Sequence, residues 1–171
     1  MHLRPATIDD VTSIAALHVA SWRDAYSAIL DPAFLAGPVE KDRLEVWRGR
    51  LHSSAENQRI IVAIDAGALV GFACVFGDES PKWGACVDNL HVGSSIRGKG
   101  VGAALLRSAG LWIAVNYPES GLYLWVFETN ARARKFYERL GGRTVERSAS
   151  QIPSAAGASI LRIYWPAPAE L

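Results

Sequence analysis

The middle of the chain reads Gly93-Ser94-Ser95-Ile96-Arg97-Gly98-Lys99-Gly100-Val101-Gly102. A strand-like segment ends just before it at Val92, and the apolar stripe of a helix, from Ala104 to Ile113, follows it. Glycine lets successive backbone N–H groups point into one concavity, and a helix that starts there adds its unpaired first-turn N–H groups and its positive dipole end. With the charges of Arg97 and Lys99, this arrangement favours a bound phosphate group, although the glycines could serve turn geometry alone.

Three phosphate-binding motifs overlap this stretch. Gly93 to Gly100 is close to the P-loop, but Gly100 replaces the residue whose hydroxyl would hold Mg²⁺. Gly98 to Ala103 matches the G-x-G-x-x-A of dinucleotide folds, which leaves a dinucleotide-dependent oxidoreductase as an alternative function. That fingerprint follows its strand directly and belongs to repeated parallel crossovers, whereas here a loop intervenes and antiparallel strands are expected before it. The third motif is R-x-x-G-x-G, formed by Arg97, Gly100 and Gly102.

A second block of sequence supports the third motif. It follows the strand-like segment Leu122 to Val126 and reads Asn130-Ala131-Arg132-Ala133-Arg134-Lys135-Phe136-Tyr137-Glu138-Arg139-Leu140-Gly141-Gly142. This block is similar to N-x-x-A-x-x-F-Y-x-x-x-G-F, with Gly142 in place of the last aromatic residue. Together with R-x-x-G-x-G and the preceding Leu90-His91-Val92, it resembles the acetyl-coenzyme A signature of the GNAT superfamily of N-acetyltransferases. In element order the resemblance covers about residues 3 to 165.

Hydrophobic periodicity predicts the order of elements around these motifs. Three helices come first, then three antiparallel strands, a helix, a strand, a helix and a final strand pair. The strands are expected at Ile60–Ile64, Leu69–Phe76, Trp83–Val92, Leu122–Val126, Thr144–Arg147 and Ser159–Trp165. We therefore predict the α+β (mixed α/β) class in one domain over residues 1–171, with a mainly antiparallel central sheet and one β-α-β crossover. The GNAT resemblance implies helices on both faces of that sheet.

Composition limits the classes of function. The chain has 171 residues, with 18 Lys and Arg against 17 Asp and Glu, and this balance disfavours a nucleic-acid partner. The longest apolar run, Ala66 to Gly77, is shorter than the roughly 18 residues of a membrane span. Cys74 and Cys86 are expected to be free thiols in a reducing cytoplasm, and no signal peptide is visible. The histidines lack the spacing of metal ligands, so we expect no metal.

The resemblance implies acetyl-coenzyme A as the co-substrate and assigns residues to hold it. The N–H groups from Arg97 to Gly102, including Gly98, Lys99, Gly100 and Val101, would bind its diphosphate. The pantetheine arm would pair with the backbone of Leu90, His91 and Val92, as in β-strand addition. In the family this is possible because the strands equivalent to Trp83–Val92 and Leu122–Val126 splay apart. Asn130 would contact the same arm.

Transfer to an amine also needs a base and an acid. A lysine-like amine of pKa about 10.4 is only roughly one part in two thousand neutral at pH 7. Asp88 lies where some family members carry the base, but it could equally be a hydrogen-bonded strand carboxylate, because a bulge in this strand would change its facing. His91 and Asn89 are further candidates. Tyr137 is the acid for the departing thiolate by resemblance, and it could instead be a packing aromatic residue.

The acceptor side is less defined by the sequence. Trp22 and Tyr26 fall in the region that forms the acceptor wall in the family, and their rings could face a cationic amine, although their spacing also suits a core position. We expect direct acetyl transfer, without an acetyl-enzyme, to a small-molecule amine or a peptide N-terminus. The alternative from another class is a non-catalytic module that binds acyl-coenzyme A. The last strands could also pair two copies into a homodimer.

Overall fold

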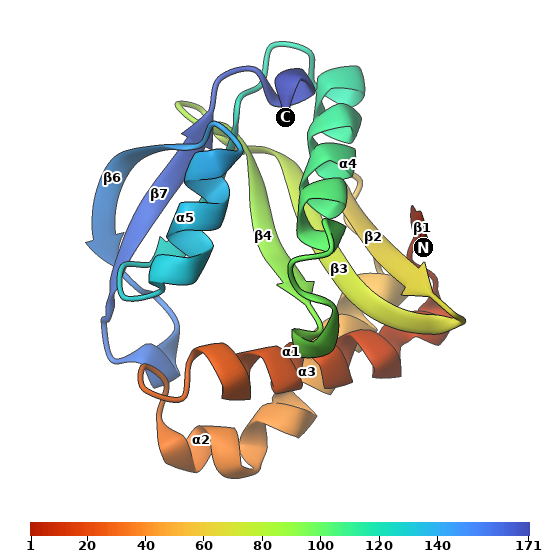
Figure 1. The fold of residues 1–171 in the computed structure, drawn as a ribbon, viewed down its shortest axis with the longest axis vertical. Coiled ribbons are helices and arrows are strands. Elements are labelled where there is room, and N and C mark those ends of the chain that lie inside the picture. The colour runs from red at the N-terminus through yellow and green to blue at the C-terminus, as the bar shows by residue number, and fades with distance from the viewer.

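Seven strands form one sheet in the computed structural model, which describes all residues from 1 to 171 (Figure 1). The strands are β1 (His2–Pro5), β2 (Gln58–Asp65), β3 (Ala68–Ser80), β4 (Gly84–Val92), β5 (Leu122–Phe127), β6 (Arg143–Ala149) and β7 (Ser159–Trp165). The helices are α1 (Val11–Ala25), α2 (Pro32–Ala36), α3 (Pro38–His52), α4 (Val101–Asn116) and α5 (Ala131–Arg139). Along the sheet the order is β1-β2-β3-β4-β5-β7-β6, and only the β4–β5 pair is parallel.

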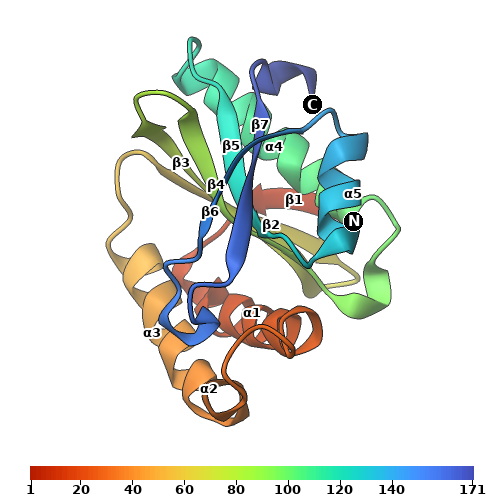
Figure 2. The same cartoon turned by 90° about the vertical axis from the view of Figure 1, so that its left-hand side faces the viewer.

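Helices cover both faces of this sheet. Helix α4, with α5 beside it, packs on one face, where Leu105, Leu106 and Ile113 have no exposed surface. On the other face, α1 and α3 pack against β2 and β3 through Trp47 and Phe72, which are equally buried. Figure 2 shows α5 and α3 on opposite sides of the strands. Burying each large apolar side chain stabilises the fold by about 1.5–3 kcal/mol, so the sheet is held from both sides.

The predicted fold class and the predicted order of elements are confirmed, with one added strand. β1 at the sheet edge was not predicted, because it has only four residues and its partner on β2 sets its register, with Leu3 opposite Ala63. The single crossover is β4-α4-β5. None of the helices combines the length and the apolar composition needed to span a bilayer.

β4 and β5 stay together only at their first residues. The paired positions are Ala85 with Leu122 and Cys86 with Tyr123, and beyond them the two strands share no ladder. The backbone of β4 therefore has one free edge from Val87 to Val92, while its other edge pairs with β3. This gap in the middle of the sheet determines where the functional site lies.

A bulge at Asp88 sets which way the end of β4 faces. Val75 pairs with Val87 and Cys74 pairs with Asn89, so Asp88 is the extra residue. Before the bulge, Val87 packs on the α4 face, and after it Leu90 and Val92 pack on that same face. As a result His91 points to the opposite face, where α1 lies.

Candidate active site

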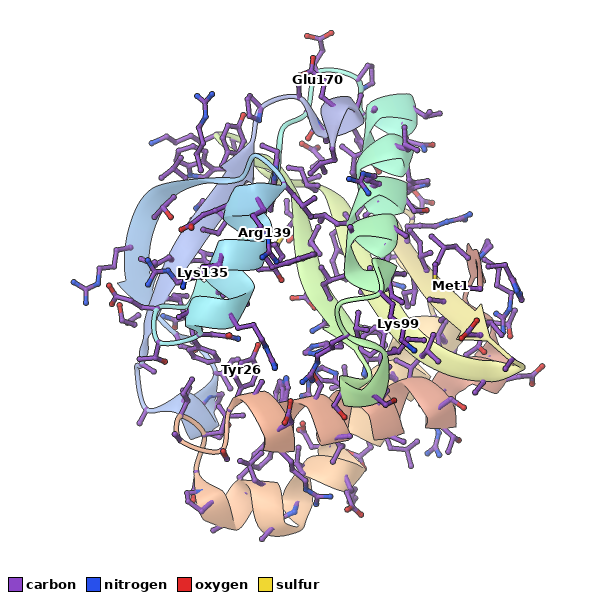
Figure 3. All side chains as sticks on the ribbon, in the orientation of Figure 1. Met1, Tyr26, Lys99, Lys135, Arg139 and Glu170 are labelled. Atoms are coloured by element: carbon purple, nitrogen blue, oxygen red, sulfur yellow. The ribbon has the colours of Figure 1, made fainter.

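A cavity of about 520 Å³ lies in the gap between β4 and β5. Six parts of the chain line it: α1, β4, the glycine turn, α4, β5 and α5. The lining residues include Ser21, Tyr26, Leu90, His91, Val92, Arg97, Gly98, Gly100, Val101, Gly102, Asn130, Arg132, Tyr137 and Arg139. Figure 3 labels Tyr26 near the end of α1, Arg139 on α5 and Lys99 on the turn that leads into α4.

The glycine turn forms an open cradle at the N-terminus of α4. Gly98 and Gly100 have φ angles of 80° and 82°, the left-handed region that favours glycine, and a Cβ on either would meet no atom within 4 Å. No side chain caps α4, so its first N–H groups remain available to a ligand. The space, the free donors and the helix dipole fit the diphosphate of coenzyme A.

Arg97 connects this turn to α1. Its Nε donates to the Val92 carbonyl at 3.2 Å, and its guanidinium pairs with Asp24. Arg132 on α5 approaches the same carboxylate at 3.6 Å, so Asp24 lies between two arginines that line the cavity. Arg97 thereby lowers the pKa of Asp24. Lys99, which was predicted to contact the cofactor, is exposed and does not line the cavity.

Tyr137 closes the cavity from α5. Its ring packs near Phe136 and Trp165, and burial raises the pKa of its phenol, which keeps the hydroxyl protonated at neutral pH. The hydroxyl makes no hydrogen bond to the protein. It is also not one of the buried side-chain atoms that lack a partner, which are His18 Nε2, Arg134 Nε and Arg162 Nη1. The Tyr137 hydroxyl is therefore open to the cavity that it lines.

Asn130 holds the start of α5. Its Oδ1 accepts a hydrogen bond from the Ala133 N–H at 3.1 Å, which caps the helix. Asn130 also lines the cavity and interacts with the Tyr26 hydroxyl, which partly offsets the rise that burial causes in the pKa of Tyr26. The cap explains why asparagine precedes this helix, and because the cap uses Oδ1, the amide nitrogen of Asn130 is the group that meets the Tyr26 hydroxyl.

Ser21 and His91 form a buried pair beside the cavity. Ser21 Oγ on α1 lies 2.8 Å from His91 Nδ1 on β4, and the two share a hydrogen bond. His18 packs against His91 with ring centroids 4.4 Å apart, and Trp47 Nε1 donates to His18 Nδ1 at 3.0 Å. Burial, together with the charges of Arg97 and Arg43, lowers the pKa of His91 to about 3, so its imidazole is neutral.

Besides Lys99, two predicted site residues lie outside the cavity. The carboxylate of Asp88 is exposed, pairs with Arg50 at 2.7 Å and does not line the cavity, because the bulge turns it toward α3. Trp22 is 6% exposed and belongs to the apolar cluster with Val19 and Leu30, not to the cavity. Of the two aromatic residues expected at the acceptor wall, the structure brings only Tyr26 to the site.

Comparison with known proteins identifies the family. Residues 18–142 match the model of the Acetyltransferase (GNAT) family, which is more than half of the chain. The chain belongs to the GNAT acetyltransferases. The matched region runs from α1 to the end of α5 and so includes every element that lines the cavity. The predicted family and the predicted enzyme class are confirmed.

Proteins similar in sequence to this GNAT protein are named as N-acetyltransferases. A probable N-acetyltransferase of Mycobacterium tuberculosis is 28% identical over 149 residues, which cover 84% of this chain and 83% of the relative. A spermine/spermidine N(1)-acetyltransferase of Bacillus subtilis is 35% identical over 81 residues, covering 44% of this chain and 53% of the relative. The fold is shared with the crystal structure of PaiA N-acetyltransferase from Thermoplasma acidophilum in complex with coenzyme A, with a TM-score of 0.75 and 16% identity over 96% of this chain and 98% of that one.

Sequence reasoning missed Ser21 in this GNAT protein. Ser21 and His91 are 70 positions apart, and neither lies in a motif that points to the other. The only local signal is that His18 and Ser21 fall one turn apart on the buried stripe of α1, where polar residues need partners.

No group of three or more His, Cys, Asp or Glu side chains is placed to hold a metal ion.

Proposed function

We propose that this GNAT protein, as one domain over residues 1–171, transfers the acetyl group of acetyl-coenzyme A directly to a primary amine. The observation that carries the proposal is the cavity between β4 and β5, which both the uncapped start of α4 and Tyr137 line. The helix start suits a diphosphate, and the Tyr137 hydroxyl suits a departing thiolate. The family match supports the same reaction class.

The donor is held by backbone groups. The N–H groups of the turn and of Val101 and Gly102 would bind the diphosphate, with Arg97 as the nearby cation. The free edge of β4 from Leu90 to Val92 would pair with the amide groups of the pantetheine arm, as an added strand does. Bound in this way, acetyl-coenzyme A supplies an activated acetyl group as a thioester.

The transfer makes one bond and breaks one bond. The lone pair of the neutral amine nitrogen forms the C–N bond to the acetyl carbon, and the C–S bond breaks with its electron pair on sulfur. A β4 backbone N–H stabilises the charge that develops on the carbonyl oxygen. Tyr137 donates its proton to the sulfur and recovers one from solvent, while water takes the proton released by the nitrogen. Asp88, paired with Arg50 outside the cavity, is assigned no part in this step.

The acceptor is a small-molecule amine or a peptide N-terminus, and Tyr26 forms part of the wall that meets it. The relative from Bacillus subtilis is named for spermine and spermidine, which are also amines.

The free thiols Cys74 and Cys86 suit a reducing cytoplasm. The free edge of β6, exposed along its length, is where two copies would pair, and light scattering after gel filtration tests that.

The experiment measures free thiol released from acetyl-coenzyme A with a panel of primary amines, next to calorimetric binding of coenzyme A. The proposal expects binding together with amine-dependent thiol release that Tyr137→Phe strongly reduces. Binding without amine-dependent release would support the alternative, a non-catalytic module. No heat with coenzyme A, together with retention on a nicotinamide cofactor, would support an oxidoreductase and overturn the proposal.

A further inference from the structure

No aspartate or glutamate lines the cavity, and three carboxylates on the surrounding elements have cationic partners. Asp24 pairs with Arg97 and Arg132. Asp88 pairs with Arg50 at 2.7 Å, and Glu128 pairs with Arg147 at 2.6 Å. The charged residues that line the cavity itself are arginines, namely Arg97, Arg132 and Arg139. An incoming ammonium group would therefore find no carboxylate in the cavity wall, and bound coenzyme A phosphates would neutralise only the charge near the glycine turn.

The polar groups on the acceptor side are neutral. This side is the α1 face of β4, where Ser21, Tyr26 and His91 line the cavity. His91 is surrounded by Ser21 and His18 from α1, Phe72 from β3, Arg43 from α3 and Arg97 from the turn. The two arginines and burial oppose a charge on His91, and burial does the same for the tyrosinate form of Tyr26.

These groups can still hydrogen-bond an uncharged amine. Ser21 Oγ has acceptor capacity beyond its bond to His91. His91 Nε2 makes no bond to the protein and is not one of the buried unpartnered atoms, so it is reachable from the cavity. Removing an ammonium from water without a carboxylate partner is costly, whereas a neutral amine loses little. The acceptor side thus selects the neutral form of the amine.

A site that binds only the neutral form of an amine favours amines of low pKa. At pH 7 roughly one lysine-like amine in two thousand is neutral, against about one in ten for an α-amino group of pKa about 8, a difference of about 200-fold. We propose that the acceptor is a weakly basic primary amine, the α-amino group of an amino acid or peptide, rather than a lysine side chain or a polyamine. This inference rests on the proposed function. It separates this chain from the spermine/spermidine relative, which matches only 44% of it.

The test compares kcat/KM at pH 7 for four acceptors with acetyl-coenzyme A: alanine amide, a tetrapeptide with a free N-terminus and no lysine, Nα-acetyl-lysine amide and spermidine. We expect the kcat/KM of one of the two α-amines to exceed that of both strongly basic amines by about 100-fold. The difference in kcat/KM should shrink toward pH 9.5, because more of the lysine amine is then neutral. The choice between alanine amide and the tetrapeptide tells a small acceptor from a peptide. Spermidine or the blocked lysine as the best substrate at pH 7 would overturn the inference and leave the acetyltransferase function intact. Absence of thiol release with every amine would overturn both.

A pair of variants tests the cause. Ser21→Asp places a carboxylate at the acceptor side, and Ser21→Asn is the uncharged control of similar size. We expect Ser21→Asp to raise the ratio of kcat/KM for blocked lysine over alanine amide by at least about tenfold, and Ser21→Asn to leave that ratio near its wild-type value. Calorimetric binding of coenzyme A reports whether each variant is folded. An unchanged ratio in a folded Ser21→Asp protein would contradict the inference, and the wild-type comparison stands even where the variant does not fold.

Discussion

The donor end and the acceptor side of the cavity are built in different ways. The donor end is one continuous stretch, from Val92 through the glycine turn to Gly102, and it binds through backbone N–H groups. The acceptor side is assembled from side chains of separate elements, as in the bond between Ser21 on α1 and His91 on β4. A backbone site depends on glycine and chain direction, which a motif can encode. A site made of side chains depends on packing, which no short motif records.

The two regions also differ in charge. Arg97 belongs to the donor end and two more arginines line the cavity from α5, whereas the acceptor side has neutral Ser21, Tyr26 and His91. The bulge at Asp88 creates this division, because without the extra residue His91 would share the α4 face with Val87, and Leu90 and Val92 would face α1. One extra residue in β4 thus separates a free backbone edge for the donor from a neutral wall for the acceptor.

The largest effect is expected at Tyr137, which lines the cavity from α5 and belongs to neither region. Tyr137→Phe removes the proton donor for sulfur and should lower kcat by about 10²–10³-fold, within the range of general acid catalysis. The KM for acetyl-coenzyme A should change little, since the donor end is intact. Tyr164→Phe is the control, because Tyr164 packs on Trp83 away from the cavity, and it should keep wild-type kcat. A kcat within threefold of wild type for Tyr137→Phe would remove Tyr137 from the mechanism.

The second prediction concerns the neutral histidines of the acceptor side. Burial lowers the pKa of His91 to about 3 and that of His18 well below its ordinary 6.5, so the unfolded chain binds protons that the folded chain does not. The free energy of unfolding should therefore fall as the pH drops below 6.5, by up to about 1.4 kcal/mol per pH unit for each imidazole. Urea unfolding from pH 7.5 to 4.5 measures this slope.

His91→Gln removes one of the two buried imidazoles. It should therefore lower the slope of the unfolding free energy against pH by up to about 1.4 kcal/mol per pH unit, the contribution of one proton. His52→Gln is the control, since His52 is exposed at the end of α3. An equal slope in wild type and His91→Gln would show that His91 is charged in the folded protein, and the acceptor side would then not be neutral.

The sequence predicts the donor end better than the acceptor side. Both the turn at the donor end and its place in the cavity are predictable, because Arg97, Gly100 and Gly102 form a local motif whose geometry the structure shows directly. Tyr137 was also placed at the cavity by its block. Its role, like that of the donor residues, stays a prediction until the variants above are measured.

The acceptor side could not be predicted because its placement depends on long-range pairing. The direction in which the Asp88 side chain points depends on the register between β3 and β4, where the bulge lies, and the sequence of β4 alone does not fix that register. Trp22 and Tyr26 have the same helical spacing, yet the chain that follows α1 buries the first in a cluster with Leu30 and leaves the second at the cavity. β1 was missed for a related reason, since a four-residue edge strand takes its register from β2.

The third prediction tests whether the donor end acts through its backbone. Gly100→Ala adds a Cβ at a φ of 82° in the open cradle and should weaken coenzyme A binding about tenfold by calorimetry. Gly67→Ala is a matched control, because Gly67 has a φ of 80°, equal open space and a place in the β2–β3 turn away from the cavity. Both variants should lose about 1 kcal/mol of stability from the left-handed backbone. Equal coenzyme A affinity in the two would show that the cradle does not bind the diphosphate.

The smallest effect concerns Asp24, which joins the two regions. Its carboxylate pairs with Arg97 and Arg132, so a diphosphate that uses these arginines must compete with it. Asp24→Asn removes the competing charge, and we expect coenzyme A to bind several-fold more tightly, with little change in stability because the pair is half exposed. Asp31→Asn is the control, since Asp31 caps α2 away from the cavity and its asparagine would still accept from the Ala33 N–H. Weaker binding in Asp24→Asn would mean that the carboxylate orients Arg97 for the ligand rather than competing with it, and α1 would then belong to the donor end as well as to the acceptor side.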